Sequence, residues 1–301
     1  MARIRSEDLS SKSIGELKAV MKAMRISPAG CLEKKDLIDK ILKAKEEQKS
    51  KPVPINKQYQ ETVGGLEAYC LQTHEKPELL VFVFHGFGAN AENLASIQEA
   101  LAQKKSGSKK VRFVCLNAPN EMGSGSYAWW PLDLPGLLQK VFTVGVENLF
   151  KGNKPNEMGS TVSLVKNVIE AEAKRFSLDL SKVVYCGFSQ GSWLATELAL
   201  TAKECPKALC IFSSALYREE WVEKAKERKG LKVIQTHGRQ DFVLPLMQGQ
   251  MLSKALSNAG CDVDFFEFDG AHTIPMDIKG VVRPDFGCFF WMLRWSVIAH
   301  Q

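Results

Sequence analysis

The hydrophobic pattern of this chain changes at about residue 61. After that point, short apolar runs alternate with segments in which apolar residues recur at helical spacing. The apolar runs predict strands at residues 79–84, 111–116, 183–186, 208–213, 231–236 and 263–268. The periodic segments predict helices at 91–103, 162–176, 190–202, 246–259 and 286–299. This alternation is typical of a mostly parallel sheet that helices cover on both faces.

Residues 13–43 carry a different pattern, with apolar side chains at helical spacing on both sides of the break ISPAGC. This predicts a helix–loop–helix pair that ends in the charged run KAKEEQKSK. Pro52 and Pro54 then indicate a linker. We therefore expect three parts: a small all-α module at 1–50, a linker at 51–60 and an α/β domain at 61–301.

Composition limits the classes of protein that fit. The chain is 45% hydrophobic and 25% charged, as is usual for a globular protein, and no apolar stretch is long enough to suggest a membrane span. The segment MARIRSEDLSSKS lacks the apolar core of a signal peptide. The eight cysteines are scattered, and Cys115, Cys186 and Cys210 fall inside apolar runs, which indicates buried thiols in a reducing compartment. We expect a cytoplasmic protein.

The residues that follow the strands are the candidates for chemistry, because ligands of parallel sheets bind beyond the carboxyl ends of the strands. Ser189 follows the third predicted strand, HGRQD with Asp241 follows the fifth, and DGAH with His272 follows the last. Serine, aspartate and histidine in this order form a known arrangement of a catalytic triad.

Ser189 lies in GFSQG, between the strand-like run VVYC and a helical pattern. A serine between strand and helix sits on a tight, strained turn with its hydroxyl above the end of the sheet. Gly187 and Gly191 fit such a turn, because side chains at these positions would collide with it. The alternative is an ordinary loop between strand and helix that happens to contain a serine.

Two histidines and two aspartates compete for the remaining positions of the triad. His272 is the expected base, whereas His237 is expected to be a turn residue or a packed neighbour. Asp241 is the expected acid. Asp269 is its main rival, but it lies only three residues from His272 and would have to fold back to reach the imidazole.

The segment HGFGAN fits two functions. Gly86, Gly88 and Ala91 match a dinucleotide-binding fingerprint, but the next strand ends in Leu-Asn-Ala without the acid that this fingerprint requires. The other function is an oxyanion hole, in which the main-chain N–H groups of Phe87 and Gln190 are the donors. We therefore expect no nucleotide cofactor, and the absence of a C-x-x-C motif gives no support to a structural zinc site.

Aromatic residues after the second strand suggest a substrate pocket. Trp129 and Trp130 are expected on the same edge of the sheet as Ser189, where their rings offer apolar area to an acyl or alkyl group. The following run LDLPGLLQKVFTVGVENLF has few charges and suits a cap over an apolar channel. The alternative is that both tryptophans pack in the core and that the run is a buried helix.

Taken together, GFSQG, HGFG, LNAP, the WW…D segment, HGRQDFVLP and GAH resemble the phospholipase/carboxylesterase family, which includes acyl-protein thioesterases. The likeness covers about residues 79–290. It implies an α/β-hydrolase fold and a cofactor-free serine hydrolase that cleaves carboxylic esters, thioesters or lysophospholipids, with Ser189, Asp241 and His272 as the triad. Ala89 and Ser192 depart from the pattern, since the thioesterases usually have an acid and a glycine there.

The module at residues 1–50 resembles a SAP-type module in Leu17, Lys18, Gly30, Lys34, Leu37 and Ile41, although two extra residues separate Gly30 from Lys34. Residues 1–52 carry 13 Lys and Arg against 8 Asp and Glu, of a net charge of +6 for the whole chain. The resemblance permits nucleic-acid binding, but protein docking or a structural appendage fits the modest charge at least as well. A second function class thus remains open: a non-catalytic hydrolase scaffold that binds a partner through this module.

Overall fold

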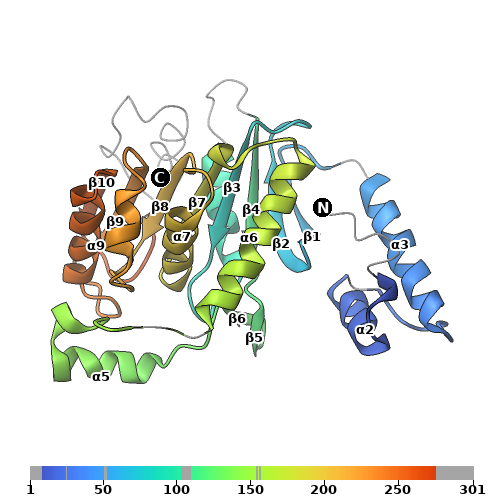
Figure 1. Ribbon diagram of the computed structural model, residues 1–301, viewed down its shortest axis with the longest axis horizontal. Coiled ribbons are helices and arrows are strands. Elements are labelled where there is room, and N and C mark those ends of the chain that lie inside the picture. Colours follow the sequence, from blue (N-terminus) through green and yellow to red (C-terminus); the bar gives the residue numbers. More distant parts are fainter. Residues whose placement is uncertain are drawn as a thin grey trace, which may run out of the picture.

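The computed structural model describes residues 9–24, 26–50, 53–102, 110–153, 155 and 157–275. Its main feature is a sheet of eight strands in the order β1-β2-β4-β3-β7-β8-β9-β10, which Figure 1 shows with helices packed against it. The six strands from β4 to β10 in this order all run parallel to one another. The strand β2 runs antiparallel to both of its neighbours, β1 and β4. The strand bounds are β1 Gln58–Val63, β2 Leu66–Gln72, β3 Leu79–Phe84, β4 Val111–Leu116, β7 Val183–Phe188, β8 Ala208–Phe212, β9 Lys232–Gly238 and β10 Asp262–Phe268.

Helices form a layer on each face of this sheet. The larger core lies under α6 (Met158–Arg175), α7 (Gln190–Thr201), α8 (Trp221–Lys226) and α9 (Leu246–Asn258). The other face packs against η1 (Glu92–Leu94) and α4 (Ala95–Ala102). Successive strand residues alternate between the two cores, as Val81 and Val83 face one and Phe82 and Phe84 the other. Burial on both faces explains why these strands are continuous apolar runs.

All six predicted strands are confirmed as the parallel part of the sheet. The helices predicted at 91–103, 162–176, 190–202 and 246–259 are also confirmed within a few residues of their ends. The helix predicted at 286–299 lies outside the described residues. The strands β1 and β2 were not predicted, and β1 already begins at Gln58, inside the expected linker 51–60. Both strands mix polar and half-buried residues, which hides them from a search for apolar runs.

Four further elements lie at the edge where the parallel strands end. The short strands β5 (Asn120–Gly123) and β6 (Ser126–Ala128) form a hairpin after β4. The helix α5 (Leu134–Val144) and the turn η2 (Val146–Asn148) follow it. Figure 1 shows α5 running across this edge of the molecule. A third short turn, η3 (Leu180–Lys182), precedes β7 at the opposite edge.

A buried arginine fixes the antiparallel strands to the rest of the sheet. Arg112 on β4 is fully buried and pairs with Glu61 of β1 at 2.8 Å and with Glu172 of α6 at 2.6 Å. Its guanidinium also donates to the Tyr59 hydroxyl. Because a buried charge needs partners for all its donors, this cluster couples β1, β4 and α6.

The predicted helix–loop–helix module consists of α2 (Ile14–Ala23) and α3 (Lys34–Ser50), beside the β1 edge in Figure 1. Ser13 and Glu16 form a capping box at the start of α2, which satisfies two free N–H groups of that helix end. Leu9, Leu17, Met21, Leu37, Ile38 and Ile41 build a small core separate from the two cores of the sheet. Among the helices in the described part of the chain, none is long and apolar enough to cross a membrane.

Candidate active site

The turn at Ser189 has the strained geometry expected of a nucleophile. Ser189 lies between β7 and α7 with φ 53° and ψ −121°, a left-handed conformation that costs energy for a residue with a side chain. A Cβ atom on Gly187 would lie 2.2 Å from the Gly191 carbonyl oxygen, and one on Gly191 would lie 2.1 Å from that of Phe84. The predicted need for both glycines is confirmed, because neither backbone neighbour can yield.

The structure brings the three predicted side chains together. The Ser189 hydroxyl lies 2.9 Å from His272 Nε2, and His272 Nδ1 lies 2.7 Å from Asp241 Oδ2. When Nδ1–H donates to the carboxylate, Nε2 is free to accept the serine proton, which is the tautomer a general base needs. The Phe188 ring packs on the imidazole with its centroid at 4.9 Å.

Asp241 is buried and fully hydrogen-bonded. Its Oδ1 accepts from the backbone N–H groups of Val243 and Leu244 at 3.0 and 2.8 Å. Burial by itself would raise the pKa of the carboxyl, but the hydrogen bonds from His237 and His272 and the charge of His272 hold it well below its usual range. Asp241 is therefore ionised at any pH near neutral and can stabilise an imidazolium.

The two rival residues have other partners. Asp269 is exposed and pairs with Arg239 at 2.8 Å. His237 is fully buried, with its Nε2 at 2.7 Å from the Leu244 carbonyl oxygen and 3.3 Å from Asp241 Oδ2. The carbonyl can only accept, so Nε2 carries a proton and His237 is a packed neighbour of the acid rather than a free base.

The two predicted oxyanion donors lie in two different segments, the start of α7 and the loop after β3. Gln190 is the first residue of α7, and the first N–H groups of a helix have no partner within it. Phe87 lies in the loop after β3, and its N–H makes no hydrogen bond within the described residues. This loop is tied to the β5–β6 hairpin, since Gly88 N–H donates to the Tyr127 carbonyl and Tyr127 N–H to that of Ala89.

The side chains of Gln190 and His85 make buried hydrogen bonds that were not predicted from the sequence. The Gln190 amide accepts from Trp129 N–H and donates to the Trp130 carbonyl, at 3.0 and 2.7 Å. The His85 ring accepts at Nε2 from Ala118 N–H at 3.1 Å, so its Nδ1–H donates to the Gly86 carbonyl at 2.7 Å. Only the position of His85 directly after β3 signals this contact in the sequence.

His85 predicts a loss of stability in mild acid. Burial lowers the pKa of its imidazole to about 4, despite the hydrogen bond to Gly86, whereas an unfolded histidine titrates near 6.5. Between these values only the unfolded chain takes up the proton, so this group removes about 3 kcal/mol of stability as the pH falls from 7 to 4. Urea unfolding at both pH values should show a smaller loss in His85→Gln, which cannot titrate. Equal losses of stability in the wild type and in His85→Gln would show that His85 is not the group responsible.

Both tryptophans pack inside the protein. Trp129 and Trp130 are buried in the larger core, and their indole N–H groups donate to the His85 carbonyl at 2.8 Å and to the Tyr217 hydroxyl at 3.2 Å. Both side chains therefore match the alternative in which the tryptophans pack in the core. The Trp129 indole thus holds the carbonyl of His85, at the start of the loop that contains Phe87, and neither ring is exposed.

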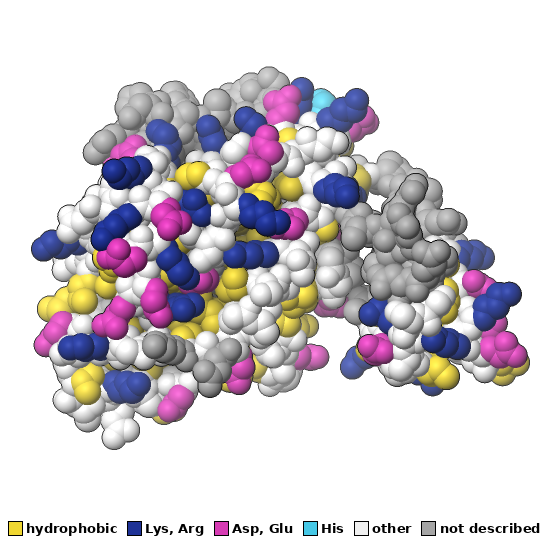
Figure 2. All heavy atoms as spheres, in the orientation of Figure 1, with side chains coloured by type: hydrophobic (Ala, Val, Ile, Leu, Met, Phe, Trp, Pro, Cys, Tyr) yellow, Lys and Arg dark blue, Asp and Glu magenta, His cyan; other side chains and the backbone are white. Residues whose placement is uncertain are grey.

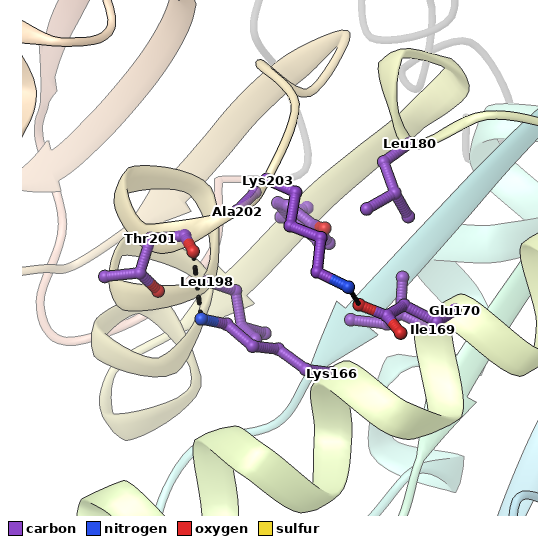
Figure 3. Close-up of a pocket in the computed structure, with 9 residues that line it drawn as sticks. Lys166, Ile169, Glu170, Leu180, Leu198, Thr201, Ala202 and Lys203 are labelled. Atoms are coloured by element: carbon purple, nitrogen blue, oxygen red, sulfur yellow. Dashed lines mark hydrogen bonds and ion pairs between the residues drawn. The ribbon is translucent and has the colours of Figure 1, made fainter.

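A small pocket elsewhere has no comparable chemistry. Figure 3 shows it at the end of α7 that is remote from Ser189, between α6, α7 and η3, with a volume of about 70 Å³. Lys203 pairs with Glu170 at 3.2 Å, and Lys166 donates to the Thr201 carbonyl at 2.9 Å. The charged side chains that line this pocket thus already have partners within it. We therefore place the site at Ser189.

Comparisons with known proteins identify the family and the fold of the chain. A family model described as Phospholipase/Carboxylesterase matches residues 68–279. No curated protein matches the sequence. The chain is similar in structure to a carboxylesterase from Mesorhizobium loti (TM-score 0.54, 15% identity, covering 72% of this chain and 92% of that chain). It is also similar to the Bacillus cereus carboxylesterase (0.51, 14%, 70% and 88%) and to esterase PE8 (0.52, 23%, 67% and 87%). At such identities the structural likeness shows the fold alone, and it confirms the predicted α/β-hydrolase fold.

Proposed function

Because the chain belongs to the phospholipase/carboxylesterase family, it is an ester hydrolase, and we propose that it cleaves carboxylic esters and thioesters through an acyl-enzyme on Ser189. The hydrogen-bonded series Ser189–His272–Asp241 carries this proposal. A free serine hydroxyl is a poor nucleophile at neutral pH, and this arrangement supplies the base and the group that orients it.

Each step follows from the position of one group. His272 Nε2 takes the hydroxyl proton as Ser189 Oγ bonds to the acyl carbon, and the N–H groups of Phe87 and Gln190 receive the negative oxygen that forms. The intermediate collapses by expelling the alcohol or thiol, which takes the proton from His272. Water then attacks the acyl carbon with His272 again as base, and Ser189 regains its proton as the acid leaves. Asp241 stays ionised throughout and stabilises the imidazolium.

The non-catalytic alternative has no comparable support. A scaffold that only binds a partner has no use for a strained serine with a base and an acid in hydrogen-bond contact. The turn at Ser189 also stores backbone strain, which lowers the stability of the fold. Without selection for chemistry, nothing would maintain this arrangement.

For the substrate, we propose a medium-length acyl group. The helix α5 is amphipathic: Leu137 is buried, whereas Leu138, Val144 and above all Phe142, at 89% exposure, face outward. Phe242, directly after Asp241, is 83% exposed. These side chains offer apolar surface at the same edge of the sheet as Ser189, and the buried tryptophans do not.

A panel of acyl esters and thioesters from acetyl to octanoyl tests this proposal. Each CH₂ that the protein buries should lower the activation free energy for kcat/KM by about 0.8 kcal/mol. Burial of about two of the additional CH₂ groups would therefore make octanoyl substrates better than acetyl ones by about tenfold. Phe242→Ala should reduce this gain and leave the acetyl rate unchanged. A profile that is flat or falls with chain length would exclude an apolar acyl site and leave a hydrolase of small esters.

We propose that the module at residues 1–50 docks a protein partner and takes no part in hydrolysis, and that the protein works in the cytoplasm. On the face of α2 and α3 that Figure 2 shows, positive and negative side chains lie side by side, which favours a protein over nucleic acid.

A truncated protein that begins at Pro54 should keep kcat/KM on a small ester within about twofold, because no residue of the site lies in the removed part. Circular dichroism controls for folding. A large loss of kcat in a folded truncation would place the module at the site.

A further inference from the structure

Two buried serines at the end of β8 contact both sides of the site. Ser213 and Ser214 are fully buried, directly after Phe212. The Ser213 hydroxyl donates to the carbonyl of Thr273, the neighbour of His272, at 3.2 Å. The Ser214 hydroxyl lies 2.8 Å from that of Ser192, which in turn lies 2.5 Å from the Ser189 carbonyl oxygen.

The direction of these hydrogen bonds follows from the acceptor at their end. The Ser189 carbonyl can only accept, so Ser192 donates to it and uses its one hydrogen. Ser214 must therefore donate to Ser192. The carbonyl at the end of this series belongs to the peptide whose N–H is that of Gln190. Because the peptide is planar and trans, holding its oxygen fixes the direction of the N–H.

Ser213 keeps a conformation that glycine adopts more easily. Its φ is 47°, in the left-handed region where a residue with a side chain is strained. Its backbone N–H donates to the Thr236 carbonyl at 2.9 Å, a bond that glycine would make equally well. The hydroxyl is what a glycine would lack, and it binds the segment that carries His272.

We propose that Ser213 and Ser214 are positioning residues for the hydrolysis. Ser213 holds the base in place against the nucleophile, and Ser214, acting through Ser192, aims the Gln190 N–H at the developing oxyanion. β8 lies beside β7, so one strand end sets the spacing of the Ser189 turn and the His272 segment. This inference rests on the proposed function, since it assigns roles relative to that reaction.

Ser213→Gly separates positioning from folding. The substitution relieves backbone strain, so Tm should stay equal or rise by roughly 2–4 °C, while kcat falls about tenfold or more and KM changes little. Ser177→Gly is the matched control: Ser177 also has a positive φ, 56°, but it is exposed after α6, away from the site. It should gain stability in the same way and keep its kcat.

Ser214→Ala tests the second serine. It should lower kcat by about tenfold at unchanged KM, because oxyanion donors act on the transition state. Ser214→Thr, which keeps the hydroxyl, should recover activity. The inference is overturned if Ser213→Gly matches the kcat of Ser177→Gly and Ser214→Ala keeps the kcat of the wild type.

Failure of the proposed function would look different, because the wild type would then hydrolyse no ester and no fluorophosphonate would add to Ser189. In that event NMR signals of the His272 imidazole decide the positioning claim. Signals that move in Ser213→Gly but not in Ser177→Gly support it, and signals unchanged in both overturn it.

Discussion

Ser189→Ala should abolish reaction with a fluorophosphonate and reduce kcat on an ester by at least about 10⁴-fold. In the wild type the reagent should add covalently to Ser189 Oγ, because His272 lies 2.9 Å away as a base. The effect is large because the substitution removes the hydroxyl that contacts the proposed base, His272. Intact-protein mass spectrometry and peptide mapping measure the adduct and its position.

The control for this result is Ser177→Ala, which removes an exposed serine after α6 and should label like the wild type. Equal labelling of Ser189→Ala and wild type would remove Ser189 from the mechanism. It would also leave the strained turn without an explanation, since its glycines and its φ of 53° serve only to present that side chain.

The parallel sheet and the positions of Ser189, Asp241 and His272 could be predicted because both follow from burial. Strands covered on two faces must be continuous apolar runs, and the runs at 79–84 and 111–116 are strands to the residue. Once six such strands are aligned, their carboxyl ends meet at one edge. Ser189, Asp241 and His272 then come together without any knowledge of loop structure.

The features that could not be predicted depend on side-chain direction. An apolar ring after a strand suits a core and a pocket equally well, and only the fold shows that Trp129 and Trp130 point inward. The apolar pattern of the following segment LDLPGLLQKVFTVGVENLF does not predict which of its side chains are exposed, although Phe142 faces solvent. The contact of Ser214 with Ser192 joins residues 22 positions apart through two rotamers, which no sequence period encodes.

His272→Ala and His237→Ala should differ in activity by at least about a hundredfold, although both imidazoles contact Asp241. His272 alone reaches Ser189, so its removal leaves no base and should lower kcat by about 10⁴-fold or more. His237 only supports the acid, which would still accept from Val243, Leu244 and His272, so kcat should fall by no more than about 10²-fold.

The pH profile separates the two roles further. In the wild type and in His237→Ala, kcat/KM should rise with pH, as general-base catalysis does, whereas the residual rate of His272→Ala should lack this rise. Asp241 adds no second limb in this range, because its pKa lies well below that of an ordinary carboxyl. His74→Ala, an exposed control, should behave as the wild type. If His237→Ala were the more damaged variant and lost the rise, the base would be His237, and the 2.9 Å contact of His272 with Ser189 would have no catalytic role.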